Sequence, residues 1–250
     1  MAAIDKGLVE MGFSAHIPRE YLPDAVPKEE YGMKESQLTY YYSKIDELRK
    51  KYRKKIIIRT GLEVDYFNWD PEPALDFINR HGSRLDYVIG SVHMMDTPGV
   101  GIWSVDDRRF DNYNEIGINT VYEQYFDVLG RMVNTCKYDF VGHLDLVKKF
   151  GYRYSDADKY REIVEKILDF VKRSSMAVEI STAGYRKYVN EIYPAEWIIK
   201  MIGEKDIPVV ISSDAHNPSE VGYKFIETRD MVKKAGVGSI VRYENREMIR

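Results

Sequence analysis

The chain has 250 residues, of which 44% are hydrophobic and 31% are charged, and its formal net charge is -3. This composition is ordinary for a soluble globular protein and excludes a disordered chain. The basic residues are spread along the sequence rather than clustered, which argues against a nucleic-acid partner. Cys136 is the only cysteine, which excludes an intrachain disulfide and a thiolate zinc cluster and favours a reducing cytoplasm.

Nothing in the sequence predicts a membrane protein or a second domain. No apolar stretch approaches the ~20 residues that span a bilayer. The first residues lack the basic start and the continuous apolar core of a signal peptide. Because there is also no low-complexity linker and no short-period repeat, we expect one domain over residues 1–250 and a cytoplasmic location.

Short apolar runs alternate with longer amphipathic ones, which predicts βαβ units around a parallel sheet. The chain opens with residues 1–10, which have the pattern of the second half of a helix with Ile4 and Leu8 facing inward. The strands that we expect after it are residues 11–16, 56–67, 87–95, 140–146, 177–182 and 209–216.

Two helices are clear between these strands. Residues 119–136, and a segment that begins at Ser155, carry apolar residues at helical spacing on one side, as helices that cover a sheet do. Ser155 and Asp158 resemble an N-terminal cap. Residues 96–117 contain turn formers and little periodicity, so we expect a long loop there, and such loops often contact substrate.

Side chains that can bind a metal stand where the expected strands end. Parallel strands converge at their carboxyl ends, where α/β barrels build their active sites. If the last strand continues through Asp214, alternation places Asp214 and His216 on one face. His81, at a helix end, reads instead as structural. The strand-end set is His16, Glu63, Asp65, His93, His143, Asp214 and His216.

Imidazole and carboxylate ligands without thiolates suit zinc, manganese or iron, and this set, which has six members even without Asp65, exceeds what one tetrahedral ion needs. Two ions about 3.5–4 Å apart lower the pKa of a shared water and stabilise the attacking and leaving oxygens, as hydrolysis of a phosphate ester requires. Two roles stay open at this point. Asp65 is either a ligand or only a cap or an acceptor for a ligating histidine. Arg186 and Lys187 are either a phosphate anchor or a solvated charge pair.

Seven segments resemble the PHP (polymerase and histidinol phosphatase) family of metal-dependent phosphoesterases, and within it the histidinol-phosphate phosphatases of histidine biosynthesis. The resemblance covers essentially the whole chain, and its most specific parts are "GSVH", "GHLD" and "ISSDAHNP". The seven segments are "GFSAHIP", "GLEVDYF", "DYVIGSVHMMD", "VGHLDLVKKF", "EISTAGYRK", "EIYP" and "ISSDAHNP".

The resemblance implies a distorted (β/α)7 TIM-like barrel that holds two or three divalent metal ions. Glu63 would bridge two of them, and Arg186 would contact the phosphate. By the family pattern, Glu63, His93 and His143 hold one ion, and this set is whole here. The full ligand set implied by the resemblance is His16, Glu63, His93, His143, Asp214 and His216.

The chain departs from the family pattern at its start. Family members open with a strand that ends in an HxH pair, followed by another metal-binding acid, and this chain has neither. We interpret this as an N-terminal truncation that removes one strand and half a helix, and the alternative is a natural variant. The second ion would keep Glu63 and Asp214 as ligands but lose the HxH histidine pair. The third ion would keep His16 and His216 but lose the metal-binding acid that follows the pair. We therefore expect at least one well-bound metal and a weakened cluster.

The missing strand has one further consequence, and two single residues also depart from the family pattern. It leaves an exposed sheet edge that a partner chain, such as a second copy in a homo-oligomer, would cover. Ala15 also stands where the family usually has Asp, which questions the local support of His16. Ser181, in place of a common Asn, is expected to be tolerated.

Our first functional hypothesis is a metal-dependent phosphatase that hydrolyses L-histidinol phosphate to L-histidinol and phosphate with metal-activated water. Asp214 or His216 would assist the proton transfers. Arg186 and Lys187 would bind the phosphate. The loop of residues 96–111, which contains Trp103, would recognise the ammonium and imidazole groups of the substrate. The alternatives are a PHP phosphoesterase on another ester, such as a nucleotide, and a non-catalytic metal-binding relic. The lack of a basic groove disfavours a polynucleotide.

Overall fold

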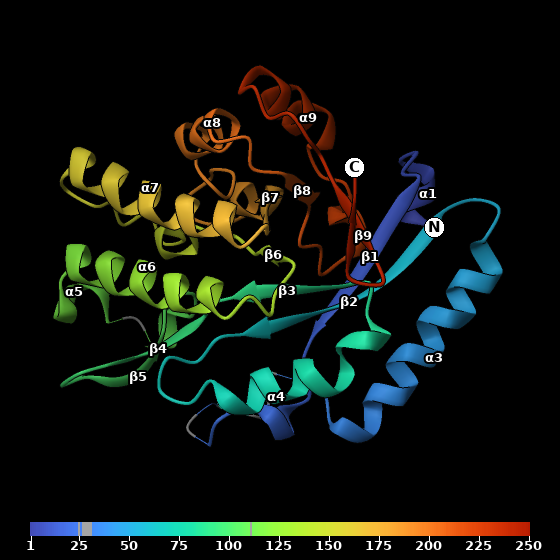
Figure 1. The fold of residues 1–250 in the computed structure, drawn as a ribbon, viewed down its shortest axis with the longest axis horizontal. Helices are drawn as coiled ribbons and strands as arrows, with labels where there is room; N and C mark the ends of the chain where they lie inside the picture. Colours follow the sequence, from blue (N-terminus) through green and yellow to red (C-terminus); the bar gives the residue numbers. More distant parts are fainter. Residues whose placement is uncertain (25, 27–31, 111) are drawn as a thin grey trace.

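The computed structural model describes residues 1–24, 26, 32–110 and 112–250. Within this part of the chain, six parallel strands form one curved sheet in the order β1-β2-β3-β6-β7-β8 (Figure 1). Each of the six strands overlaps a segment expected to be a strand, and β1 begins at Glu10, inside the segment expected to be helical, where the helix α1 covers only Ala2–Asp5. Their bounds are β1 Glu10–His16, β2 Ile57–Asp65, β3 Tyr87–Ser91, β6 Phe140–Val141, β7 Ala177–Ser181 and β8 Val209–Ser212.

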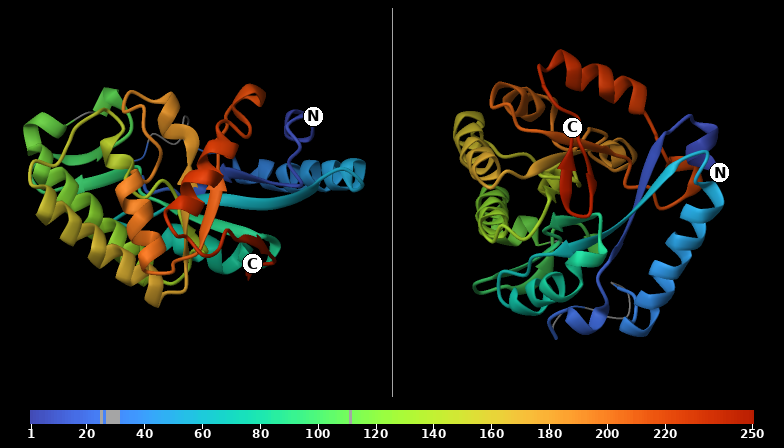
Figure 2. Two further views of the ribbon diagram at one scale, coloured as in Figure 1. Left: turned by 90° about the horizontal axis from the view of Figure 1, so that it is seen from above. Right: turned by 45° about the vertical axis from the view of Figure 1, so that its right-hand side comes forward.

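Helices lie around the outside of this curled sheet, as the right-hand view of Figure 2 shows. The arrangement is the expected distorted TIM-like barrel. No helix in the described part of the chain is long and apolar enough to cross a membrane. The helices are α1 Ala2–Asp5, α3 Glu35–Tyr52, α4 Glu72–His81, α5 Tyr113–Ile116, α6 Ile118–Asn134, α7 Ala157–Arg173, α8 Glu196–Glu204 and α9 Phe225–Lys234.

The two expected amphipathic helices are α6 and α7, which pack side by side (Figure 1). The buried side of α7 includes Val164, Ile167 and Leu168, at the spacing that the sequence shows. Its N-terminal cap is Asp156, whose carboxylate accepts hydrogen bonds from the backbone N–H groups of the second and third helical residues. The cap is therefore one residue later than the expected Ser155.

Residues 87–95 were expected to form one strand and instead form parts of two. Strand β3 ends at Ser91, and β4 (Met94–Thr97) then pairs antiparallel with β5 (Gly101–Ser104). The expected long loop of residues 96–117 therefore begins with a hairpin. Gly99 and Gly101, with φ of 84° and 90°, allow the tight turn. Asp111, which also belongs to that loop, lies outside the described residues.

The last parallel strand is shorter than expected. Strand β8 ends at Ser212, and Asp214 has a φ of 43°, in the left-handed region. The strand therefore does not continue through Asp214, and strand alternation does not place Asp214 and His216 on one face.

Strands β1 and β8 are the outer strands of the described sheet, and a cavity of about 950 Å³ lies between them. Met11 and Phe13 of β1 and Val210 and Ile211 of β8 line it. A further strand between them stays a prediction. At the amino end of the strands, the hairpin of β9 (Arg242–Glu244) and β10 (Glu247–Ile249) packs Tyr243 against Phe140.

Candidate metal centre

Glu63, near the end of β2, lies at the centre of three imidazoles. Its Oε1 is 3.1 Å from Nε2 of His143 and 3.6 Å from Nε2 of His93. Its Oε2 is 3.9 Å from Nε2 of His16. The hydroxyl of Ser91 donates to Oε1 at 2.7 Å and fixes the carboxylate. Side chains from four strand ends thus meet, as the sequence predicts for parallel strands.

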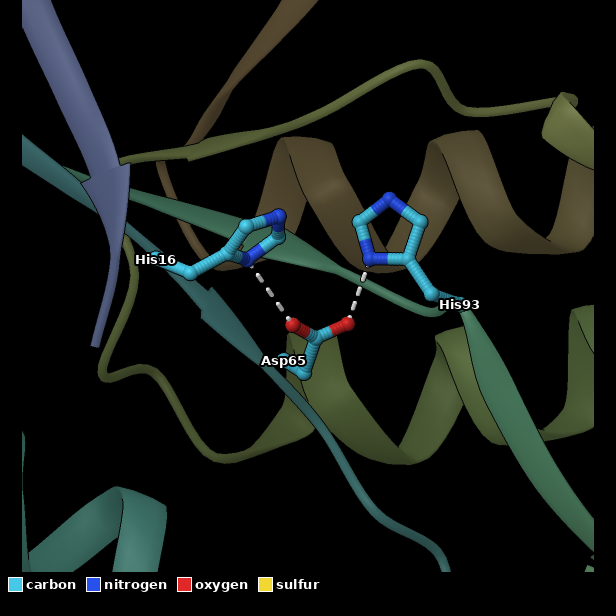
Figure 3. A group of neighbouring side chains, drawn as sticks. All are labelled: His16, Asp65 and His93. Atoms are coloured by element: carbon cyan, nitrogen blue, oxygen red, sulfur yellow. Dashed lines mark hydrogen bonds and ion pairs between the residues drawn. The ribbon is translucent and has the colours of Figure 1, made fainter. Parts of the chain in front are cut away.

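Asp65 orients two of these imidazoles (Figure 3). Its Oδ1 is 2.5 Å from Nδ1 of His93, and its Oδ2 is 3.3 Å from Nδ1 of His16. With Nδ1 of each ring turned to Asp65, each Nε2 faces Glu63. A carboxylate in this position fixes the tautomer and the ring orientation of metal-binding histidines. Asp65 therefore supports His16 where Ala15 offers no side-chain acceptor.

The donor atoms are close enough to hold divalent cations. Among the residues that the structure describes, two overlapping groups have ligand atoms within 4.8 Å of one another: Glu63, His93 and His143, and His16, Asp65 and His93. Buried or partly buried imidazole and carboxylate donors of this kind suit zinc, manganese or iron. Nδ1 of His143 is also buried and makes no hydrogen bond in the structure. The residues present fit a divalent metal centre.

The pKa values of these side chains are shifted because carboxylates and imidazoles lie close together in a largely buried setting. Burial lowers the pKa values of His16 and His93, but the nearby carboxylates, chiefly Glu63 for His16 and Asp65 for His93, raise each to about 9. Burial alone would raise the pKa of Asp65, but the neighbouring His93 and His16 have the larger combined effect and lower this pKa to about 2. Protons on these imidazoles thus neutralise the carboxylates, and a bound cation would replace them.

Asp214 and His216 line the same cavity as the candidate metal ligands but belong to neither group of donor atoms among the described residues. The His216 side chain is 73% exposed, and its Nδ1 is 3.7 Å from Oδ1 of Asp214. The end of β8 at Ser212 explains this placement, since the segment leaves the sheet before both residues. Their assignment as ligands stays a prediction.

The cavity has a volume of about 570 Å³ and carries charges of both signs. Acidic residues Asp106 and Asp107 face it with the metal-binding side chains. Lys149 binds the Asp106 carboxylate at 3.1 Å. We did not single out these residues in the sequence, although "DDRR" lies in the segment expected to contact substrate. The basic residues that line the cavity are Arg108, Arg109, Lys149 and Lys187.

Two residues expected to contact substrate make other contacts in the structure. Trp103 is fully buried, and its Nε1 donates to Oγ1 of Thr97 at 2.9 Å, so the expectation that it reads the substrate is wrong. The reason is the β4–β5 hairpin, which turns this indole into the core. Arg186 donates through Nη2 to the carbonyl oxygens of Ser213 and Asp214, at 2.7 and 3.1 Å, and so holds the segment after β8.

The fifth histidine, His81, is away from this centre. Its ring stacks on Phe77, with ring centroids 4.5 Å apart, as expected for a structural histidine. Histidine content alone therefore does not mark the site, and the positions at strand ends do.

Known proteins resemble this chain over most of its length. A family model described as PHP domain matches residues 1–183. A probable histidinol-phosphatase of Deinococcus radiodurans is 33% identical over 251 residues, which cover 99% of this chain and 89% of that protein. The histidinol-phosphatase of Bacillus subtilis is 32% identical over 237 residues, which cover 89% of this chain and 87% of that protein.

The fold is also similar to a solved structure. The histidinol phosphate phosphatase of Lactococcus lactis, complexed with zinc, L-histidinol and phosphate, has a TM-score of 0.81 and covers 100% of this chain and 90% of its own, at 23% identity. This likeness concerns the fold, and it confirms the distorted barrel. From the match of the family model and the relatives above 30% identity, the chain belongs to the PHP domain family.

Proposed function

We propose that the chain hydrolyses L-histidinol phosphate to L-histidinol and phosphate, as a phosphoric monoester hydrolase of histidine biosynthesis. The observation that carries this proposal is the carboxylate of Glu63 among three imidazoles, beside a cavity with charges of both signs. Two relatives that are more than 30% identical over most of the chain are named histidinol-phosphatases. They support the choice of substrate.

Each residue has a role in this reaction. Glu63, His93 and His143 would hold one divalent ion, and His16, whose Nε2 faces Glu63, would add a donor beside it. Divalent ions in such a site supply an activated water and stabilise charge on the phosphoryl oxygens. Asp65 keeps the Nε2 atoms of His93 and His16 directed at Glu63. We assign two or three ions of zinc, manganese or iron.

The cavity wall would bind the rest of the substrate. L-histidinol phosphate carries a phosphate at one end and an ammonium and an imidazole at the other. The basic residues Lys149 and Lys187 would attract the phosphate, and Asp106 the ammonium. We assign proton transfer to the leaving oxygen to Asp214 or His216, which line the cavity. Arg186 is retained as a phosphate contact because its Nη1 makes no hydrogen bond.

Phosphate release from a panel of monoesters tests this proposal. The protein would be stripped with a chelator, reloaded with zinc or manganese, and assayed with L-histidinol phosphate, a nucleotide and p-nitrophenyl phosphate. We expect the highest kcat/KM for L-histidinol phosphate and no turnover by the stripped protein. A preference for the nucleotide would indicate another PHP phosphoesterase. Metal binding without turnover of any ester would indicate a non-catalytic metal-binding relic of the family.

Three broader assignments accompany this function. A cytoplasmic location is supported by the single, exposed cysteine Cys136. One domain over residues 1–250 is supported by a main cluster of buried side chains that includes residues from Ile17 to Val232. A homo-oligomer stays a prediction, which light scattering would test.

A further inference from the structure

Glu179 connects the two strands that flank its own. It lies in β7, is 3% exposed, and lines the cavity between β1 and β8, so its side chain faces the barrel interior. Its Oε2 accepts the backbone N–H of His143, after β6, at 2.7 Å. Its Oε1 accepts the hydroxyl of Ser212, the last residue of β8, at 2.6 Å. One carboxylate therefore holds both neighbouring strand ends.

The first of these hydrogen bonds fixes a residue of the metal centre. His143 has a φ of 22°, which a residue other than glycine seldom adopts. The hydrogen bond from its backbone N–H to Glu179 stabilises that conformation. The conformation in turn sets the direction of the imidazole, whose Nε2 lies 3.1 Å from Glu63.

The second hydrogen bond fixes the start of the segment that carries Asp214 and His216. Thr182 and Arg186, which follow β7, bind the carbonyl oxygens of Ser212, Ser213 and Asp214 in the same region. Among these contacts, only the Glu179 carboxylate bonds to the His143 side as well.

We infer that Glu179 is a positioning residue that sets the separation between the group of Glu63, His93 and His143 and the cavity wall of Asp214 and His216. Its importance for turnover rests on the proposed function, but its effect on metal binding does not. If Glu179 only satisfied buried polar groups, its replacement in a folded protein would leave metal affinity unchanged.

Three variants separate these accounts. Glu179→Gln keeps an oxygen for the His143 N–H and offers an amide N–H to the Ser212 oxygen, so it preserves both contacts. Glu179→Ala removes both, and Ser212→Ala removes only the contact to β8. Thr228→Val is the control, because it alters a buried hydroxyl on α9 that makes no hydrogen bond.

The measurement is calorimetric titration of each stripped protein with zinc, after circular dichroism has established that it is folded. We expect Glu179→Ala to weaken zinc binding by about 10- to 100-fold, as the loss of supporting hydrogen bonds at metal sites does. Glu179→Gln and Thr228→Val should match the wild type. Ser212→Ala should weaken only the sites that depend on Asp214 and His216, leaving the tightest zinc in place.

Wild-type zinc affinity in folded Glu179→Ala would overturn the inference, and so would a loss in Glu179→Gln as large as in Glu179→Ala. If Glu179→Ala does not fold, the test of the inference rests on Glu179→Gln and Ser212→Ala. In that case, wild-type zinc affinity at every site of Ser212→Ala would overturn the inference. A wild-type protein that binds zinc but hydrolyses no L-histidinol phosphate would defeat the proposed function and leave these titrations valid.

Discussion

Oδ1 of Asp65 lies 2.5 Å from Nδ1 of His93, so the buried carboxylate holds the ring with Nε2 directed at Glu63. The Asp65 side chain is almost completely enclosed. Its second oxygen serves His16 in the same way. The orientation of two candidate ligands therefore depends on one residue.

Replacing Asp65 by Asn tests this dependence. The amide has one accepting oxygen, so only one imidazole keeps its acceptor, and we expect zinc affinity to fall by about 10- to 100-fold in calorimetric titration. Asp96→Asn, on the exposed side of β4, is the matched control and should bind zinc like the wild type. Equal affinity in the two variants would contradict the role of Asp65.

The stability of the metal-free protein should decrease as the pH rises from 6.5 to 9. His16 and His93 have a pKa of about 9 in the folded protein and 6.5 when unfolded, so the folded state binds more protons between these values. The stabilisation is complete below pH 6.5 and is lost as the pH passes 9. Urea unfolding of chelator-treated protein at pH 6, 7.5 and 9 measures it. A constant or rising free energy of unfolding across this range would refute the attribution to these two imidazoles.

Metal binding should release protons near pH 7.5. His16 and His93 are protonated there in the metal-free protein, and an imidazole nitrogen must lose its proton to bind a cation. We expect about one proton or more per zinc, obtained from titration heats in buffers of different ionisation enthalpy. His81→Gln, away from the centre, should release the same number. Heats independent of the buffer would show that the imidazoles are already neutral.

Asp106→Asn should weaken the binding of substrates that carry a positive charge. Asp106 lines the cavity, and its loss removes an attractive charge for the substrate ammonium. We expect the KM for L-histidinol phosphate to rise about tenfold, which corresponds to about 1.4 kcal/mol. The KM for p-nitrophenyl phosphate, which has no ammonium, should stay unchanged. An equal rise for both substrates would assign the effect to the metal centre instead.

Trp103→Phe should affect stability and leave catalysis unchanged. The indole N–H donates to Thr97 in a buried setting, and Phe cannot replace that hydrogen bond. We expect the free energy of unfolding to fall by about 1–3 kcal/mol in urea. The KM for L-histidinol phosphate should equal that of the wild type. A raised KM with unchanged stability would restore Trp103 as a substrate contact.

The sequence by itself determined the alternation of strands and helices and the strand-end positions of His16, Glu63, His93 and His143. It could do so because hydrophobic periodicity reports which side of an element is buried, and because parallel strands bring their carboxyl ends together. The side chains at those ends were therefore predictable as a group without any knowledge of their distances.

Only the tertiary structure decided the contacts between side chains. The sequence left the role of Asp65 open, and the structure places its two oxygens against two imidazoles. It also turned Trp103 into the core and ended β8 before Asp214, because hairpin pairing and local backbone conformation depend on neighbours far away in the chain. Glu179 reads in the sequence as one acid in a buried strand. Its function as a link between β6 and β8 exists only once the three strands lie side by side.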